Sequence, residues 1–391
     1  MAEKTTLTAV PADCLPYARH QVEEADIAAV ADVLRSDRLT QGPRIEAFEE
    51  TLARRVGARF GVAFSSGTAA LHGAVAAAGV GPGDEGITSP MTFCATANCL
   101  IYQGARPVFA DVNEDTLTLN PDQFEARLTS KTKVVLPVDY AGHPADMERI
   151  LAIAEKKGIT VIEDACHALG ARWQGRSIGS ISHMTVFSFH PVKHITTGEG
   201  GMVVTNNPGF AQRLRAFRTH GIVRDPEKIK EEPWHYAMVS LGWNYRISDI
   251  ACALGSAQLQ RLDANLAHRR ELAAAYSAQL ADAAEVRLPA VSKDAEPAWH
   301  LYPIRLQGQK PQERRAGLFK ALVAGGIVPQ VHYIPVHYHP YYRERFGLSP
   351  GMFPVAEAAY NGLLSLPLFH AMPSGEVSRV VEAVQTFLRR C

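Results

Sequence analysis

The sequence predicts an α/β protein with a mostly parallel sheet covered by helices, followed by a second, smaller α/β domain. Strand-like and helix-like patterns alternate over roughly the first 200 residues, as in parallel sheets with helical crossovers. From about Ser248 the chain becomes rich in Ala and Leu and reads as a long helix. The length of 391 residues is enough for more than one domain. We therefore expect a large domain over residues 14–250 and a small C-terminal domain over residues 251–391.

Each expected element rests on a local pattern of apolar residues. In the first part, helical spacing predicts helices over Glu23–Ser36, Ile45–Val56, Thr68–Ala78 and Met147–Lys157. Short apolar runs predict strands over Val62–Ser65, Gly86–Ser89, Val108–Val112, Val134–Asp139, Thr160–Asp164, Met184–Phe189 and Gly201–Thr205. In the second part we expect one long helix over Asp249–Leu280, a strand over Trp299–Leu306 and a final helix over Pro373–Arg390.

Composition excludes several classes of function. The formal net charge is zero and no long basic block occurs, which argues against nucleic acid or an acidic membrane surface as a partner. No secretory signal is visible at the start, and no apolar run reaches the length of a membrane span. The six cysteines are scattered without a Cys-x-x-Cys pair, which favours a reducing cytoplasm over a disulfide framework. They are Cys14, Cys94, Cys99, Cys166, Cys252 and Cys391.

Lys193 is the first candidate for chemistry. It lies in Ser188-Phe-His-Pro-Val-Lys193, on a tight loop between two expected core strands. Partial desolvation there lowers the pKa of an amine and makes it a nucleophile toward an aldehyde. The alternative is a surface lysine that caps a carbonyl group.

Three further features fall at the carboxyl ends of expected strands, where open parallel sheets bind ligands. Ser65-Ser-Gly-Thr68 opens a helix and, together with Ser188, could cradle a phosphate, although a plain N-cap at Ser66 or Thr68 fits equally well. Asp164 ends an apolar strand and needs a cation nearby, unless it only caps a helix. Phe93 is either a stacking platform or a core residue.

One cofactor accounts for all four features together. An aldehyde needs a lysine, a phosphate needs the serine-glycine-threonine turn, a ring nitrogen needs an acid, and a flat ring needs a stacking partner. Pyridoxal 5'-phosphate (PLP) has all four needs.

With these features the sequence resembles the DegT-type nucleotide-sugar aminotransferases, which have the aspartate aminotransferase fold. The resemblance covers nearly the whole chain and implies PLP-dependent fold type I, with a seven-stranded sheet in the large domain. Within the family the chain is most similar to the pseudaminic acid branch, through Val331-His-Tyr-Ile-Pro-Val-His337, Pro340-Tyr-Tyr-Arg343 and Ile195-Thr-Thr-Gly-Glu-Gly-Gly201. The other matching motifs are Leu39-Thr-Gln-Gly-Pro43, Ser65-Ser-Gly-Thr68, Ser89-Pro-Met-Thr-Phe93, Glu163-Asp-Ala-Cys-His167, Ser188-Phe-His-Pro-Val-Lys193 and Gly242-Trp-Asn-Tyr-Arg-Ile-Ser-Asp249.

The resemblance implies a role for each matching residue. For the cofactor, which alternates between PLP and its amino form PMP, Lys193 forms the Schiff base and later moves the proton, while Asp164 pairs with the ring nitrogen. Phe93 stacks on the ring, and His167 lies near the 3-hydroxyl. The phosphate is held by Ser66, Gly67, Thr68, Ser188 and, from the neighbouring subunit, Asn244. The sugar-nucleotide site is lined by Tyr17, Thr40, His332 and Tyr333.

The resemblance also implies the reaction and the assembly. This branch moves an amino group from L-glutamate to C4 of a UDP-linked 4-keto-6-deoxy-N-acetyl-hexosamine, forming UDP-4-amino-4,6-dideoxy-N-acetyl-β-L-altrosamine. The expected unit is a cytoplasmic homodimer with a shared active site. Gly86, in an expected strand, and His194, after the lysine, depart from the family pattern. His332, His337 and His339 lack a matching Cys or carboxylate motif, so we expect no metal.

Three other functions remain open. The chain could aminate another UDP- or dTDP-linked keto sugar, with the same chemistry and a different pocket. It could be a DegT-type regulator without turnover, although the presence of Lys193 and Asp164 argues against this. A sugar dehydratase on this fold would have the lysine replaced, commonly by His, and here Lys193 holds the position.

Overall fold

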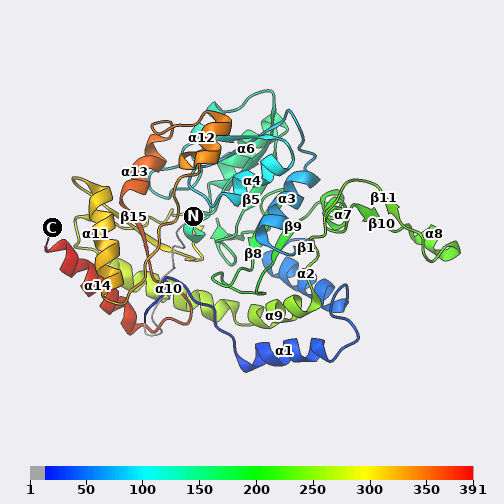
Figure 1. The fold of residues 1–391 in the computed structure, drawn as a ribbon, viewed down its shortest axis with the longest axis horizontal. Coiled ribbons are helices and arrows are strands. Elements are labelled where there is room, and N and C mark those ends of the chain that lie inside the picture. The colour runs from blue at the N-terminus through cyan, green and yellow to red at the C-terminus, as the bar shows by residue number, and fades with distance from the viewer. Residues whose placement is uncertain (1–13, 391) are drawn as a thin grey trace, which may run out of the picture.

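A computed structural model describes residues 14–390 and shows a large sheet with helices on both faces (Figure 1). Cys391 and the start of the chain, where we expect no signal, lie outside the described residues. Within this sheet β9 runs antiparallel to both of its neighbours, β1 and β8, and the other pairs are parallel, so the sheet is mostly parallel, as predicted. In spatial order the seven strands are β1 (Phe60–Phe64), β9 (Gly201–Thr205), β8 (Met184–Ser188), β5 (Thr160–Asp164), β4 (Thr132–Leu136), β2 (Glu85–Thr88) and β3 (Arg106–Phe109).

Two hydrophobic cores cover the two faces of this sheet. Alternate strand residues point to opposite faces, so Ile162 packs in one core and Val161 in the other. One face is covered by α3 (Gly67–Ala77), α4 (Ala95–Tyr102) and α7 (Pro208–Phe217). The opposite face is covered by α2 (Pro43–Val56), α5 (Pro121–Ala126), α6 (Met147–Lys157) and α9 (Asp249–Leu259).

Gly86 is explained by this packing. A Cβ atom at Gly86 would lie 2.3 Å from Leu100 Cδ2, so only glycine lets α4 pack this closely on β2. The glycine that departs from the family pattern therefore fits its neighbours here.

The C-terminal part builds a separate core on a three-stranded antiparallel sheet. Its strands are β12 (Val286–Arg287), β14 (Tyr302–Leu306) and β15 (Leu363–Leu366), and its helices are α10 (Leu262–Gln279), α11 (Pro311–Ala324) and α14 (Gly375–Leu388). A fourth cluster, with α12 (Pro340–Phe346), α13 (Pro354–Gly362) and two 3-10 turns, η1 (Tyr140–Gly142) and η2 (Val336–Tyr338), joins this part to β3. We keep as a proposal the division into domains that we expect from the sequence, with a large domain over residues 14–250 and a small one over residues 251–391.

Smaller elements lie around these cores. The first helix, α1 (Glu24–Leu34), packs on α9. A small sheet contains β13 (Ala295–Glu296), β6 (Arg172–Trp173) and β7 (Arg176–Ser177). An arm over residues 222–238, with β10 (Ile222–Val223), α8 (Pro226–Glu231) and β11 (Ala237–Met238), projects beyond α7 (Figure 1).

The expected single helix over Asp249–Leu280 is wrong, because it divides into α9 and α10 at Gln260 and Arg261. The division lies where the chain meets Asp26, which is fully buried. Gln258 Nε2 donates to Asp26 Oδ2 at 2.8 Å, and the Arg261 guanidinium donates to both carboxylate oxygens at 3.0 and 2.8 Å. A buried carboxylate needs such partners, and the break between the two helices lies next to the residues that supply them.

Candidate active site

A cavity of about 370 Å³ lies at the carboxyl ends of β5 and β8 and at the start of α3. Most of the residues predicted from the sequence line it. These are Tyr17, Ser66, Gly67, Thr68, Phe93, Asp164, His167, Ser188, Lys193, His332 and Tyr333. Residues that are far apart in the chain therefore meet at one edge of the sheet. This is the edge at which ligands bind in open parallel sheets.

Lys193 is held on the loop between β8 and β9. Its backbone N–H donates to the carbonyl of His190 at 2.9 Å, and the loop closes through Thr197 N–H, which donates to the carbonyl of Phe189 at 3.1 Å. The exposed part of the Lys193 side chain faces the cavity. Burial lowers the pKa of Lys193, while Cys166 and Asp164 nearby oppose this shift. The amine is therefore easier to deprotonate than a surface lysine, as a nucleophile requires.

Asp164 ends β5 with its side chain buried. Its Oδ2 accepts a hydrogen bond from Thr96 Oγ1 at 2.7 Å, and its Oδ1 accepts one from Cys166 N–H at 3.2 Å. No Lys, Arg or His forms an ion pair with Asp164 in the part of the chain that the structure describes. A buried carboxylate without a cation is costly, so the site fits a ligand that brings a protonated ring nitrogen.

The start of α3 fits a phosphate. Ser66 is the N-cap, and its side chain accepts a hydrogen bond from Ala69 N–H at 3.1 Å. The first N–H groups of a helix have no partner within the helix, and an anion is favoured there. A Cβ atom at Gly67 would lie 2.9 Å from Ser188 Cβ, so glycine lets the end of β8 approach the helix. The N-cap and the phosphate cradle are thus compatible.

Aromatic side chains form one wall of the cavity. Phe93 is 57% exposed, so the interpretation of this residue as part of the core is wrong. Its ring centroid lies 6.0 Å from that of Tyr333. Tyr333 Oη is 3.0 Å from His167 Nε2, within hydrogen-bond distance. Tyr17 and His332 also contact each other, with 5.2 Å between their ring centroids.

Burial keeps the histidines of this wall neutral. Burial, together with a smaller contribution from the charge of Lys193, lowers the pKa of His332 to about 3. The pKa of His167 is also far below its ordinary value, first because of burial and then because of Lys193. Neutral imidazoles beside Lys193 avoid placing a second positive charge in the cavity.

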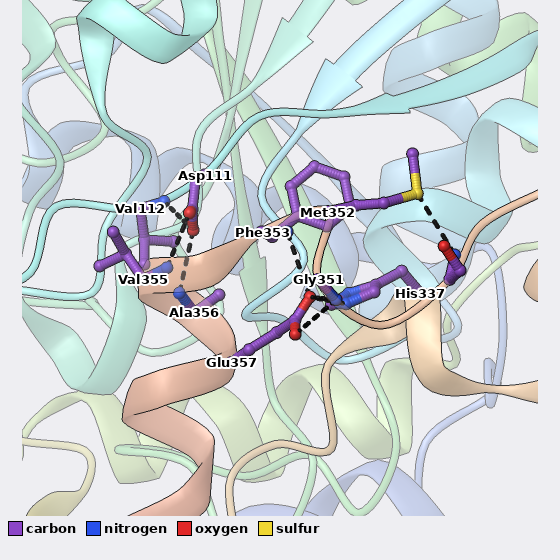
Figure 2. A network of polar contacts seen from close by, with 10 residues as sticks. Asp111, Val112, His337, Gly351, Met352, Phe353, Val355, Ala356 and Glu357 are labelled. Carbon is purple, nitrogen blue, oxygen red and sulfur yellow. Dashed lines mark hydrogen bonds and ion pairs between the residues drawn. The ribbon is translucent and has the colours of Figure 1, made fainter.

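The segment over residues 330–339, which carries His332 and Tyr333, is anchored through His337, whose side chain contacts Glu357 (Figure 2). Glu357 on α13 contacts His337 Nε2 at 2.9 Å and accepts hydrogen bonds from Gly351 N–H and Phe353 N–H at 2.8 and 3.1 Å. Asp111, after β3, accepts hydrogen bonds from the N–H groups at the start of α13, each at 2.9 Å. The wall is therefore tied to the large sheet through side-chain carboxylates.

Two predicted site residues do not line the cavity. Thr40 pairs with Ser248, and Asn244 pairs with Thr219, and both side chains are exposed. They lie on neighbouring segments, because Asp249 accepts hydrogen bonds from Gly42 N–H and Arg44 N–H at 2.8 and 2.9 Å. Within one chain, these two residues and the cavity are separate.

Two polar residues, Thr96 and His300, are among the cavity-lining residues to which the sequence analysis gave no role. Thr96 could have been found, since it lies one helical turn after Phe93. His300 gave no signal, because it lies inside the expected strand Trp299–Leu306, whose observed form, β14, begins only at Tyr302. His194, the departure next to the lysine, is buried outside the cavity lining, and its Nε2 is 3.0 Å from the carbonyl oxygen of Ala298.

Two negative findings concern the described residues, 14–390. None of their helices is both long enough and apolar enough to span a membrane. Among these same residues, no group of three or more His, Cys, Asp or Glu side chains is arranged to hold a metal ion. The three histidines of the 330–339 segment instead have separate neighbours, such as Ser365 for His332 and Glu357 for His337.

Comparisons with known proteins agree with this geometry. The sequence model of the DegT/DnrJ/EryC1/StrS aminotransferase family matches residues 20–385. The spore coat polysaccharide biosynthesis protein SpsC of Bacillus subtilis is 40% identical over 378 residues, which is 96% of this chain and 97% of SpsC.

Solved structures match over the same extent. Spr1654 of Streptococcus pneumoniae in its PMP form, a protein described as a "putative sugar aminotransferase", superposes with a TM-score of 0.91 and 31% identity over 96% of this chain and 99% of that one. Helicobacter pylori PseC, an aminotransferase involved in the biosynthesis of pseudaminic acid, superposes with a TM-score of 0.90 and 30% identity over 97% and 100% of the two chains.

Proposed function

This chain belongs to the DegT/DnrJ/EryC1/StrS aminotransferase family, and we propose that it transfers the amino group of L-glutamate to C4 of a UDP-linked 4-keto-6-deoxy-N-acetyl-hexosamine. Membership makes it a PLP-dependent sugar aminotransferase. The proposed product is UDP-4-amino-4,6-dideoxy-N-acetyl-β-L-altrosamine, an intermediate on the way to pseudaminic acid. We do not propose the regulator or the dehydratase function, because the chain belongs to an aminotransferase family.

The observation that carries the substrate proposal is the wall formed by Tyr17, His332 and Tyr333. Aromatic and imidazole groups can cover the apolar face of a sugar and bond its hydroxyl and acetamido groups without adding charge. A site built to hydrogen-bond such groups rejects analogues that lack them by large factors. The superposition with PseC over the whole chain supports the same substrate class.

Each of the chain's own residues has a proposed task. When bound, PLP supplies an electron sink that allows an amino group to move between substrates. Lys193 binds the cofactor and moves the proton that must be transferred when the amino group changes its carrier. Asp164 keeps the ring nitrogen of the cofactor protonated. Ser66, Gly67, Thr68 and Ser188 hold the phosphate, and Phe93 and His167 orient the ring.

We propose that the functional unit is a homodimer in the cytoplasm. Asn244 and Thr40 are exposed on neighbouring segments away from their own cavity. In the dimer, Asn244 reaches the phosphate of the partner's cofactor, and Thr40 reaches its sugar nucleotide.

A second candidate substrate is another UDP- or dTDP-linked keto sugar. The identity of 40% with SpsC, a spore coat polysaccharide protein, is higher than that with PseC and favours this alternative.

The two candidates are separated by a substrate panel. Purified holoenzyme is given L-glutamate and a series of UDP- and dTDP-linked 3-keto and 4-keto sugars, and the amino sugar is identified by mass and NMR. We expect amination at C4 of the UDP-linked N-acetyl sugar, with at least tenfold higher kcat/KM than for sugars without the acetamido group. Better turnover of a dTDP-linked keto hexose lacking that group would contradict the proposed substrate.

A further inference from the structure

His300 lines the cavity beside Lys193, although no sequence motif assigned it a task. Its backbone N–H donates to the carbonyl of Ala141 at 2.9 Å. At Gly142, which has a φ of 94°, an added Cβ atom would lie 2.7 Å from the carbonyl oxygen of His167 and 3.0 Å from the backbone nitrogen of His300. The glycine therefore allows the segments of His167 and His300 to approach each other directly.

A buried arginine fixes the other side of the same segment. Arg269 is fully buried and forms no ion pair among residues 14–390. Its Nη1 donates to the carbonyls of Trp299, His300 and Leu368 at 3.1, 3.4 and 3.0 Å. These contacts and the glycine hold the His300 backbone between two cores, so the position of its ring is well defined.

The rings of His300 and His167 are in contact. Their centroids are 4.4 Å apart and their planes are inclined by 41°. The Nδ1 atom of each ring is buried and has no hydrogen-bond partner within the described chain. An unmade hydrogen bond at a buried polar atom is expensive, so each of these two atoms needs a partner, and the ring in contact with it carries one. The other nitrogen of His167, Nε2, already contacts Tyr333 Oη.

Both rings are neutral. Burial lowers the pKa of His300 well below its ordinary value, and Lys193, His167, His194 and Arg269 lower it further. His167 is lowered by burial and by Lys193, His332 and His194. A neutral imidazole carries one N–H, and only one proton fits between two Nδ1 atoms. A hydrogen bond between these two atoms would therefore couple the tautomers of the two rings.

We propose that His300 is a positioning residue that pairs with His167 through their Nδ1 atoms and so fixes the tautomer of His167. With the shared proton on His300 Nδ1, His167 carries its own proton on Nε2 and donates to Tyr333 Oη. The Tyr333 hydroxyl group is then free to donate its proton in a hydrogen bond to a bound sugar. This consequence for the sugar rests on the proposed function, whereas the pairing of the two histidines does not.

The pairing is tested by NMR on cofactor-free protein with 15N-labelled histidine, using His167→Gln to assign His167. His300→Phe keeps the ring volume but cannot form the hydrogen bond, and His300→Asn places an amide near the position of Nδ1. We expect His167 in the wild type to be a single tautomer, and in His300→Phe to show signals averaged between both tautomers. His300→Asn should restore the single form. Unchanged His167 signals in His300→Phe, or equal spectra of the two variants, would overturn the inference.

A kinetic readout follows the same pair of variants. The kcat with the sugar nucleotide should fall about tenfold in His300→Phe, the size of one lost hydrogen bond, and recover at least in part in His300→Asn. Equal losses in both variants would mean that His300 acts only by packing. If no keto sugar of the panel is aminated, the proposed substrate fails, while the spectra still decide the histidine pairing.

Discussion

At the scale of single residues, the site is a set of buried groups whose partners are incomplete without a ligand. Asp164 has two hydrogen-bond donors but no cation among the described residues. Lys193 has a lowered pKa because it is buried. These properties fit a cofactor that brings an aldehyde, a phosphate and a protonated ring nitrogen. Most of the residue types were readable from the sequence, and Thr96 could have been found from its spacing to Phe93, but the imidazole of His300 could not, since its place in the cavity depends on contacts between distant segments.

Asp164→Asn should lower kcat by roughly a thousandfold, or ~4 kcal/mol, because the neutral amide no longer holds the ring nitrogen protonated. Thr96→Val is the matched variant: it removes one hydrogen bond to Asp164 and keeps its charge, so we expect a fall of only about tenfold. Steady-state kinetics on both holoenzymes measures the difference. An Asp164→Asn enzyme within about threefold of wild type would reject the assignment.

Glu163 and Asp139 are two further buried acidic residues near Asp164. Both are fully buried, and Glu163 Oε1 and Asp139 Oδ2 have no hydrogen-bond partner among residues 14–390. Burial raises the pKa of Glu163 to about 7, against the effect of hydrogen bonds from Thr185 and Ser182. Burial also raises the pKa of Asp139, and the charge of Glu163 adds to this.

This pair should make stability depend on pH. A folded-state pKa above the unfolded value of about 4.3 contributes stability that is fully present below pH ~4.3 and is lost as the pH rises through about 7. For Glu163 alone the loss in the free energy of unfolding is on the order of 4 kcal/mol. Denaturant unfolding of wild type and Glu163→Gln between pH 5 and 8 measures it (~1.4 kcal/mol per pH unit at most). The same decline in both proteins would show that Glu163 is not the titrating group.

At the scale of elements, most helices and strands follow from periodicity. The predictions of α6, β5 and β9 are confirmed to the residue. β3 and β4 begin and end earlier than predicted, and the residues after them form isolated bridges instead, Val112 with Leu119 and Val138 with Asp164. The division between α9 and α10 could not be predicted, since it depends on Asp26, which lies more than 200 residues earlier in the chain.

The anchor of the 330–339 segment belongs to this scale. Glu357→Ala leaves His337 and the N–H groups of Gly351 and Phe353 without their acceptor. We expect the free energy of unfolding to fall by about 1–3 kcal/mol and KM for the sugar nucleotide to rise several-fold, because His332 and Tyr333 lose their support. Glu344→Ala, an exposed position on α12, is the control. If KM and stability were the same in both variants, the anchor would have no role in positioning the wall.

At the scale of the whole molecule, the chain has a cavity on one surface and two exposed candidate site residues on another. The sequence predicted both sets of residues, but periodicity could not tell which of them meet within one chain. The structure brings the residues around Lys193 together and leaves Asn244 and Thr40 apart from them. We propose that a second copy of the chain completes the site.

Complementation between variants tests the shared site. Lys193→Ala and Asn244→Ala should each be nearly inactive alone, because each lacks one part of every site. When subunits exchange, a mixed dimer has one site with both Lys193 and Asn244 intact, so activity should return to about a quarter of the wild-type value in an equal mixture. Mass photometry or differently tagged chains show the exchange. No recovery after proven exchange would place Asn244 and Lys193 in the same chain's site.

The attachment of the cofactor tests the central claim most directly. Holoenzyme is reduced with borohydride, digested and mapped by mass spectrometry, with Lys193→Ala treated in parallel. The account predicts a pyridoxyl group on Lys193 and none anywhere in Lys193→Ala. A pyridoxyl group on another lysine of the wild-type protein, with Lys193 unlabelled, would contradict it.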